Sequence, residues 1–252
     1  PIFVTEVVLM RKLQTISKLL ALGMLALLSG CATTQQAEGV NDPFEGYNRA
    51  MYGFNNVMDE AIISPAAKVY DAVLPDAISW GISNVLQNLL EVRYVLNDLL
   101  QLKFEQAAND FGRIALNTTV GFGGLFDVAG YAGHYPSDED FGQTLGVWGV
   151  DAGPYIVLPL LGPSSVRDAF GTVVDTYSHP VTYIKDNGTR NAFFIVGLLD
   201  RRASLLGAKR VLEEATTDEY TFVRDAYTQR RLSLVYDGNP PEDDDFDVFS
   251  DD

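Results

Sequence analysis

The chain has 252 residues, enough for one large domain or two small ones. Its 34 acidic and 18 basic residues give a formal net charge of −16, which disfavours binding to nucleic-acid phosphates and diffuse attraction to anionic lipid heads. The hydrophobic content of 47% permits a sizeable core, and the single cysteine, Cys31, excludes an intrachain disulfide.

Residues 1–30 have the pattern of an export signal. Arg11 and Lys12 supply positive charge, LLALGMLALL (residues 19–28) is apolar, and small residues precede Cys31 in LSGC. The apolar stretch is half of the ~20 residues that a membrane-spanning helix needs. Residues 1–9 lack the character of a signal's positive region, so we interpret Met10 as the true start.

LSGC resembles the lipobox of bacterial lipoproteins, in which the cysteine carries a diacylglycerol and becomes the acylated amino terminus. In that class Ala32 after the cysteine favours the outer membrane over the inner one. We therefore expect a signal peptide over residues 1–30, lipidation at Cys31 and a polar tether over residues 31–40. The alternative is an ordinary secretory signal beside an unmodified cysteine.

A helix is predicted from about Asp42 to Ile62. Asp42 can cap it, Pro43 suits its first position, and Glu45 completes a capping box. Apolar residues then recur at spacings of three and four, which places them on one helical face. This face comprises Phe44, Tyr47, Met51, Phe54, Met58 and Ile62.

The same periodicity predicts further helices along the chain. One or two lie between Pro75 and Leu102, and others cover residues 105–117, 164–177, 189–215 and 218–236. No alternating stretch is convincing as a sheet, so the fold is expected to be mainly α, with one domain over residues 41–236. The tail, residues 237–252, is acidic and is expected to be disordered or, alternatively, to bind a basic partner.

The centre of the chain is rich in glycine. Residues 112–162 hold 11 of the 22 glycines, interleaved with apolar and aromatic residues. Glycine allows sharp bends and close approach of the backbone to other groups, and long irregular segments in compact domains are usually functional. The centre is therefore the candidate functional region.

Groups suited to covalent chemistry do not assemble in this sequence. His134 and His179 are 45 residues apart, there is no second cysteine for a zinc site, and no nucleophile elbow or Walker loop occurs. Asp138–Asp140 could hold a cation, but a solvated loop is the simpler interpretation. Asp127 and Asp151 are expected to be caps or turn residues. We predict neither enzyme activity nor a metal or cofactor.

Three motifs carry a resemblance to the MlaA (VacJ) family of Gram-negative outer-membrane lipoproteins. They are NDPFEGYNRAMYGFN (residues 41–55), ALNTTVGFGGLFDVAG (residues 115–130) and DFGQTLGVWGVDAGPYIVLPLLGPSSVRDAFG (residues 140–171). Their order and spacing agree with the family, and the resemblance covers residues 31–236.

The resemblance implies a helical ring in the inner leaflet of the outer membrane, with an amphipathic channel. It implies that phospholipid mislocalised to the outer leaflet passes through this channel to a soluble periplasmic carrier, which delivers it towards an inner-membrane ABC transporter. It also implies a trimeric porin as partner and a hairpin beside the channel over residues 149–162.

The expected site residues follow from these motifs. The hairpin and lipid-path residues are Gly149, Gly153, Pro154, Tyr155, Ile156, Val157, Leu158, Pro159, Leu160, Leu161 and Gly162. The apolar Gly-rich motif is Phe122, Gly123, Gly124, Leu125 and Phe126. The N-terminal signature, interpreted chiefly as structural, is Asp42, Pro43, Phe44, Tyr47, Asn48, Arg49, Phe54 and Asn55.

Each of these assignments has an alternative. Ordinary core packing competes with lipid contact for every apolar residue, and ion pairing competes with phosphate binding for Arg49, Arg113 and Arg167. Residues 155–161 would reach ~10 Å as a helix or ~23 Å when extended, which suits one leaflet rather than the ~30 Å of a bilayer. A scaffold lipoprotein without a channel and a lipid-modifying enzyme are the competing functions.

Overall fold

The structure is a computed structural model that describes residues 40, 42–209 and 216–241. The predicted signal peptide, Cys31, residues 31–39 of the tether and residues 242–252 of the acidic tail lie outside the described residues.

The described chain is mainly helical, as predicted, with one two-stranded sheet. Its helices are α2 (Glu45–Met58), the π-helix η1 (Asp59–Ile63), α3 (Ser64–Val73), α4 (Asp76–Leu100), α5 (Phe104–Thr119), α6 (Val128–Tyr131), α7 (Phe141–Val147), α8 (Val166–Ser178), the 3₁₀ helix η2 (Pro180–Tyr183), α9 (Asn187–Ser204) and α11 (Glu219–Val235). The strands are β1 (Tyr155–Leu158) and β2 (Gly162–Ser165). Periodicity therefore located α2, α4, α5, α8, α9 and α11, with a single helix, α4, after Pro75, whereas α3, α6 and α7 were not predicted.

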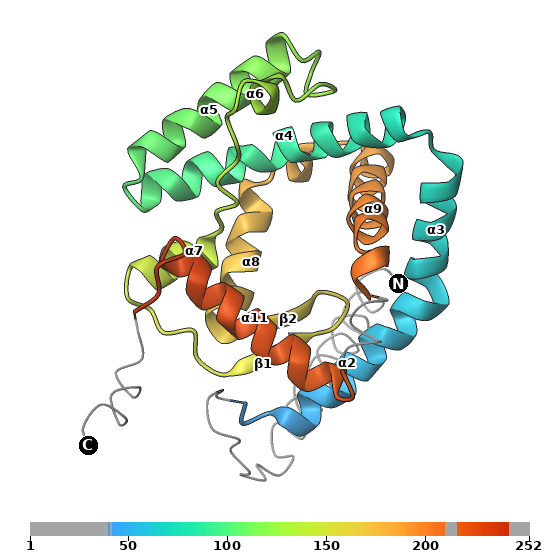
Figure 1. The fold of residues 1–252 in the computed structure, drawn as a ribbon, viewed down its shortest axis with the longest axis vertical. Coiled ribbons are helices and arrows are strands. Elements are labelled where there is room, and N and C mark those ends of the chain that lie inside the picture. The colour runs from blue at the N-terminus through green and yellow to red at the C-terminus, as the bar shows by residue number, and fades with distance from the viewer. Residues whose placement is uncertain (1–39, 41, 210–215, 242–252) are drawn as a thin grey trace, which may run out of the picture.

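The helices follow one another around a ring in the ribbon (Figure 1). α4, α3, α2, α11 and α8 form its sides, α9 lies beside α3, and α5 with α6 lies outside α4. The hairpin β1–β2 lies on the side bordered by α11 and α2. The predicted ring-like helical domain with a hairpin is therefore confirmed.

Polar contacts between α2 and α11 close the ring. The Arg49 guanidinium donates to Asp218 at 2.9 Å, and its cation lies 4.4 Å from the ring centroid of Tyr220. The Tyr52 hydroxyl donates to Glu219 at 3.2 Å. Because α2 and α11 stand at opposite ends of the described chain, these contacts join segments about 170 residues apart in sequence.

The predicted capping box is wrong. α2 begins at Glu45, its N-cap is Phe44, and no side chain caps it. Asp42 instead accepts a hydrogen bond of 2.7 Å from the Asn48 amide and a short one from the Tyr220 hydroxyl. The Asp42 carboxylate, which the sequence predicted to cap α2, therefore binds Tyr220 of α11 instead.

α2, η1 and α3 form one continuous helical run. The π-helix leads directly into α3, whose first turn contains Pro65. The Ser64 amide donates to the Asp59 carbonyl, the five-residue spacing of a π-helix. Proline lacks an amide hydrogen and is tolerated in the first turn of a helix, so Pro65 does not end the run.

The interior of the ring wall is polar. Among the described residues the largest fully buried side chains include Arg113, Gln143, Glu91 and Glu139, whereas buried hydrophobic residues are few. The apolar stripes that predicted the helices lie on the exposed side: Phe111 of α5 is 65% exposed and Phe170 of α8 is 59% exposed. The sizeable apolar core that the composition permits is therefore not formed in this part of the chain.

Buried polar faces meet one another instead. α5 buries Ala107, Asp110, Arg113 and Asn117, and α4 buries Asn88, Glu91, Asn97 and Asp98 among others. Such a distribution, with large apolar side chains exposed and polar side chains buried, is the reverse of that of a water-soluble domain. Where exposed apolar side chains form a contiguous patch, they mark contact with membrane or protein.

Candidate functional site

The candidate site is built around the hairpin. β1 and β2 pair antiparallel, with Tyr155 opposite Ser165 and Leu158 opposite Gly162. Pro159, Leu160 and Leu161 form the connecting loop, in which Leu160 has a φ of 63°. A three-residue hairpin loop commonly places one residue in this left-handed region. Leu160 and Leu161 are 58% and 69% exposed, so the tip presents apolar side chains.

The boundaries of the predicted hairpin, residues 149–162, are wrong. Gly149 and Gly153 have positive φ and belong to the segment that leads from α7 to β1, together with Pro154. The second strand is Gly162–Ser165, which the prediction did not recognise because GPSS has no strand pattern of its own.

Two asparagines of α2 bind the outer edge of β1. The Asn48 amide donates to the Tyr155 carbonyl at 3.0 Å and accepts from the Val157 amide at 2.8 Å. The Asn55 amide donates to the Leu158 carbonyl at 3.0 Å and accepts from the Leu160 amide at 2.7 Å. Edge strands need partners for their backbone groups, and α2 provides them through side chains.

The base of the hairpin packs against α11 and α2. Tyr155 and Val157 are buried, and with Tyr220 of α11 they form a small apolar cluster. The Tyr155 ring lies edge-to-face with Tyr220 at 6.3 Å and with Tyr227 at 5.9 Å. Edge-to-face aromatic pairs stabilise beyond their area burial. The base is therefore fixed by packing as well as by hydrogen bonds.

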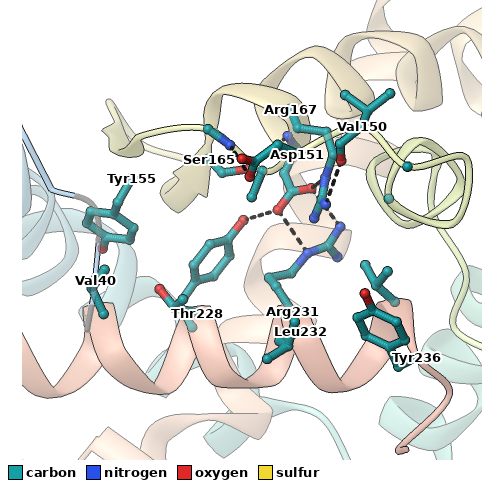
Figure 2. A pocket seen from close by; sticks show the side chains of 17 residues that line it. Val40, Val150, Asp151, Tyr155, Ser165, Arg167, Thr228, Arg231, Leu232 and Tyr236 are labelled. Atoms are coloured by element: carbon teal, nitrogen blue, oxygen red, sulfur yellow. Dashed lines mark hydrogen bonds and ion pairs between the residues drawn. The ribbon is translucent and has the colours of Figure 1, made fainter. Parts of the chain in front are cut away.

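A pocket of about 390 Å³ lies beside this base (Figure 2). α11 forms one wall through Thr228, Arg231 and Leu232, and the segment before β1 faces it with Val150 and Asp151. Its lining combines charged, hydroxyl and apolar side chains. The complete lining is Val40, Gly146, Gly149, Val150, Asp151, Ala152, Gly153, Tyr155, Ser165, Arg167, Asp168, Tyr227, Thr228, Arg231, Leu232, Val235 and Tyr236.

Ion pairs compensate the two arginines of the pocket. Arg231 binds the Asp140 carboxylate at 2.6 Å and the Asp168 carboxylate at 3.0 Å. Arg167 binds Asp168 at 3.0 Å. Burial alone would raise the pKa of Asp168, but the charge of Arg231 and the hydroxyl of Tyr227 hold this pKa below its ordinary value. The arginine charges are therefore balanced within the wall of the pocket.

The other candidate arginine, Arg113, is also ion-paired. It is buried and binds Glu91 at 2.6 Å, Asp127 at 3.2 Å and the His134 carbonyl. Burial is the main cause that raises the pKa of Glu91, although Arg113 opposes it. With Arg49 held by Asp218, the ion-pair interpretation of Arg49, Arg113 and Arg167 is the one that the structure supports.

The apolar Gly-rich motif lies apart from the hairpin, between α5 and α6 and against α4 (Figure 1). Phe122, Leu125 and Phe126 are exposed, and the rings of Phe122 and Phe126 meet edge-to-face at 6.3 Å. Gly124 has a φ of 91°, and a Cβ there would lie 2.9 Å from Asn88 Cβ. The structure therefore does not bring this motif and the hairpin into one site.

The acidic residues near the glycines have structural partners. Asp127 accepts from the Gly130 amide as the N-cap of α6, and Asp151 accepts from the Gly153 amide in a turn, as predicted. Asp140 caps α7. Glu139 is buried and binds Lys103 at 2.9 Å. Within the described residues no group of three or more histidine, cysteine, aspartate or glutamate side chains could hold a metal ion.

The contribution of α11 to the site was not recognised from the sequence. Tyr220, Arg224, Tyr227 and Arg231 recur at spacings of four, three and four, so they share one face. This face supplies the partners of Asp42, Tyr155 and the pocket carboxylates. The spacing of these residues indicated a polar and aromatic face on α11. It could not identify the residues that this face contacts, because they lie far away in sequence.

The fold and site define a class of protein: a helical ring with an apolar exterior, a polar wall and a hairpin held against one side. None of the helices among the described residues combines the length and hydropathy required to cross a membrane.

A family model described as MlaA lipoprotein matches residues 40–233. The chain is 36% identical over 240 residues to the intermembrane phospholipid transport system lipoprotein MlaA of Escherichia coli (strain K12), covering 92% of this chain and 94% of that protein. It is 36% identical over 233 residues to the protein of the same name from Haemophilus influenzae, covering 90% and 93%.

A solved structure, described as "Structural basis for maintenance of bacterial outer membrane lipid asymmetry", matches with a TM-score of 0.67 at 36% identity. The match covers 77% of this chain and 98% of that one. The chain therefore belongs to the MlaA lipoprotein family.

Proposed function

We propose that this protein is the outer-membrane lipoprotein of an intermembrane phospholipid transport system in a Gram-negative bacterium. It removes mislocalised phospholipid from the outer leaflet, passes it to a soluble periplasmic carrier upstream of an inner-membrane ABC transporter, and so maintains lipid asymmetry. The names of the relatives and the description of the matched structure support this proposal.

The observation that carries the proposal is the reversed distribution of polarity. Exposed apolar side chains on α5 and α8 suit hydrocarbon, while buried arginines of the wall are ion-paired within the protein, Arg113 with Glu91 and Arg167 with Asp168. Backbone that leaves regular structure at membrane depth is tolerated only where protein or a water-filled cavity satisfies it. The asparagines of α2 meet that condition for β1.

The ring is proposed to lie in the periplasmic leaflet, anchored by lipid on Cys31. One acyl chain holds a protein only marginally, and two or more give stable anchoring. Replacing Cys31 with Ser is expected to release the protein from membrane fractions, and persistent acylation of that variant would disprove the anchor. A trimeric porin is the proposed partner within the membrane.

The lipid path is proposed to pass the hairpin tip. Leu160 and Leu161 are exposed and apolar, and the ion-paired pocket lies at the other end of the hairpin. Passage requires no covalent step, so we propose transport without hydrolysis. Leu161→Arg is expected to impair transport in a protein that still folds, because a charge beside acyl chains costs about 2–4 kcal/mol.

Deletion of the gene tests the function. We expect more phospholipid in the outer leaflet and greater sensitivity to detergent, with both restored by the wild-type gene. An unchanged outer leaflet would contradict transport and favour a porin scaffold. Formation of lysophospholipid by the purified protein would instead indicate a lipid-modifying enzyme.

A further inference from the structure

The pocket beside α11 has one carboxylate that no cation of the described chain neutralises. Asp151 lines the pocket and is exposed, and its carboxylate accepts a hydrogen bond from the Gly153 amide at 3.2 Å. It forms no ion pair within the described residues. Asp168, by contrast, binds both Arg167 and Arg231. Asp151 is therefore the acidic group of the pocket that is available to a ligand.

The charges around the pocket leave one negative charge in excess. Two positive charges come from Arg167 and Arg231. Three negative charges come from Asp140, Asp151 and Asp168. Every nitrogen of the Arg231 guanidinium donates to Asp140 or Asp168, so an anionic ligand would have to compete with these carboxylates. The pocket therefore favours a positively charged group.

A second group in the lining lacks a partner. The Tyr155 side chain is 3% exposed, and its hydroxyl is buried without a hydrogen-bond partner among the described residues. A buried hydroxyl that makes no hydrogen bond is destabilising. Burial and the charge of Asp42 raise the pKa of Tyr155, so the hydroxyl keeps its proton and can donate it to an acceptor. A ligand that brings an oxygen atom to this hydroxyl would satisfy it.

The two ends of the pocket differ in polarity. Figure 2 shows Tyr155 at one end and Val150 and Tyr236 towards the other. Val150 and Tyr236 are each 46% exposed although they line the pocket, so this end presents apolar surface to its surroundings. The volume of about 390 Å³ is near the lower limit of ~300 Å³ for small-molecule sites, which suits a headgroup. Hydrocarbon attached to a bound headgroup would leave at the apolar end.

We propose that this pocket binds the headgroup of a zwitterionic phospholipid that carries an ammonium group, as ethanolamine phospholipids do. Asp151 binds the ammonium group, and the Tyr155 hydroxyl donates to an oxygen atom of the headgroup. The inference rests on the proposed function and deepens it by naming the class of lipid that is bound. A phospholipid without an ammonium group, such as phosphatidylglycerol, offers Asp151 no partner and binds more weakly.

Titration calorimetry of the full-length protein in detergent micelles tests the headgroup preference. The probes are short-chain phosphatidylethanolamine and phosphatidylglycerol with the same acyl chains. We expect the wild type to bind the ethanolamine lipid about fivefold more tightly, because an exposed ion pair contributes modestly to affinity. Equal affinities for the two lipids would overturn the proposal.

Two variants with the same change of charge test the role of Asp151. Asp151→Asn keeps an oxygen atom for the Gly153 amide but removes the negative charge, so the preference for the ethanolamine lipid should disappear. Asp186→Asn is the matched control, because Asp186 is also exposed and accepts from a backbone amide, that of Thr189, at 2.7 Å outside the pocket. This control should keep the preference. A preference that persists in Asp151→Asn, or is lost in both variants, would contradict the assignment.

Tyr155→Phe separates binding from folding. The Tyr155 hydroxyl has no hydrogen bond to lose in the described fold, so the free energy of unfolding of this variant should not fall. Its affinity for the ethanolamine lipid should fall about two- to tenfold, the effect of one hydrogen bond. An unchanged affinity would show that the hydroxyl does not contact the headgroup.

Soluble probes distinguish a lipid from a free amine. Phosphoethanolamine and ethanolamine have no acyl chains for the apolar end of the pocket, so we expect both to bind more weakly than the lipid. If ethanolamine binds as tightly as the lipid, a lipid is not the occupant. If gene deletion leaves the outer leaflet unchanged, the proposed function fails, whereas calorimetry still decides the pocket. Equal binding of the two lipids would refute the headgroup site and leave transport without headgroup discrimination intact.

Discussion

The crossing of α7 and α8 depends on two glycines, and replacing one of them has a calculable effect. A Cβ on Gly171 would lie 2.5 Å from the backbone nitrogen of Gly142 and 2.8 Å from its Cα. Both atoms belong to backbone, so no side chain can rotate away, and the helices must separate by roughly 1 Å to restore van der Waals contact. That movement would stretch the bond from the Phe141 amide to the Asp175 carboxylate, now 3.1 Å.

Overpacking of a well-packed site costs about 1–3 kcal/mol, and the better helix propensity of alanine returns at most about 1 kcal/mol. We therefore expect Gly171→Ala to lower the free energy of unfolding by about 1–2 kcal/mol. Gly112→Ala is the matched control, because a Cβ at this helical glycine of α5 meets nothing within 4 Å. In this control the free energy of unfolding should rise by about 0.5–1 kcal/mol.

Denaturant unfolding in detergent micelles measures both variants. The fluorescence of Trp148 can report on α7, because its indole follows that helix and packs on Phe141 with ring centroids 6.1 Å apart. A shift of the same sign in Gly171→Ala and Gly112→Ala would refute the argument that close backbone approach holds this crossing together.

Two further predictions concern buried charges. Arg113→Met leaves the fully buried Glu91 without its cation and should lower the free energy of unfolding by about 3–5 kcal/mol; a loss below about 1 kcal/mol in denaturant titration would contradict this. Burial, with Asp110 and Glu139 nearby, raises the pKa of Asp98 to about 7. The folded state thus holds an extra proton between about pH 4 and pH 7, so this group's contribution to stability falls as pH rises through that range. In Asp98→Asn the free energy of unfolding should fall less between about pH 4 and pH 7 than in the wild type. Parallel pH profiles of the wild type and Asp98→Asn would contradict the role of Asp98 in this pH dependence.

The positions of α2, α4, α5, α8, α9 and α11 were predictable from sequence because spacings of three and four persist in any solvent. The stripe with Phe170, or with Phe111, marks a helix whether it faces a core or lipid. The orientation was not predictable from the same pattern, because periodicity reports the amphipathicity of a helix and not the medium on either side. Only the structure shows that polar faces form the interior.

The site was predictable in part. The motif around Tyr155 indicated the hairpin, and Asn48 and Asn55 were recognised as part of a signature. Their binding to β1 was not predictable, because partners more than 100 residues away leave no local trace in one sequence. The strand GPSS forms only because YIVL pairs with it, which shows tertiary context overriding propensity.

The polar interior has a thermodynamic consequence. Exposure of apolar surface raises the heat capacity on unfolding, whereas exposure of polar surface lowers it. Because this protein buries side chains such as Arg113, Glu91 and Gln143 and leaves many apolar ones outside, its unfolding changes the heat capacity less than that of a water-soluble domain of equal length. The free energy of unfolding then curves weakly with temperature, so it has no pronounced maximum.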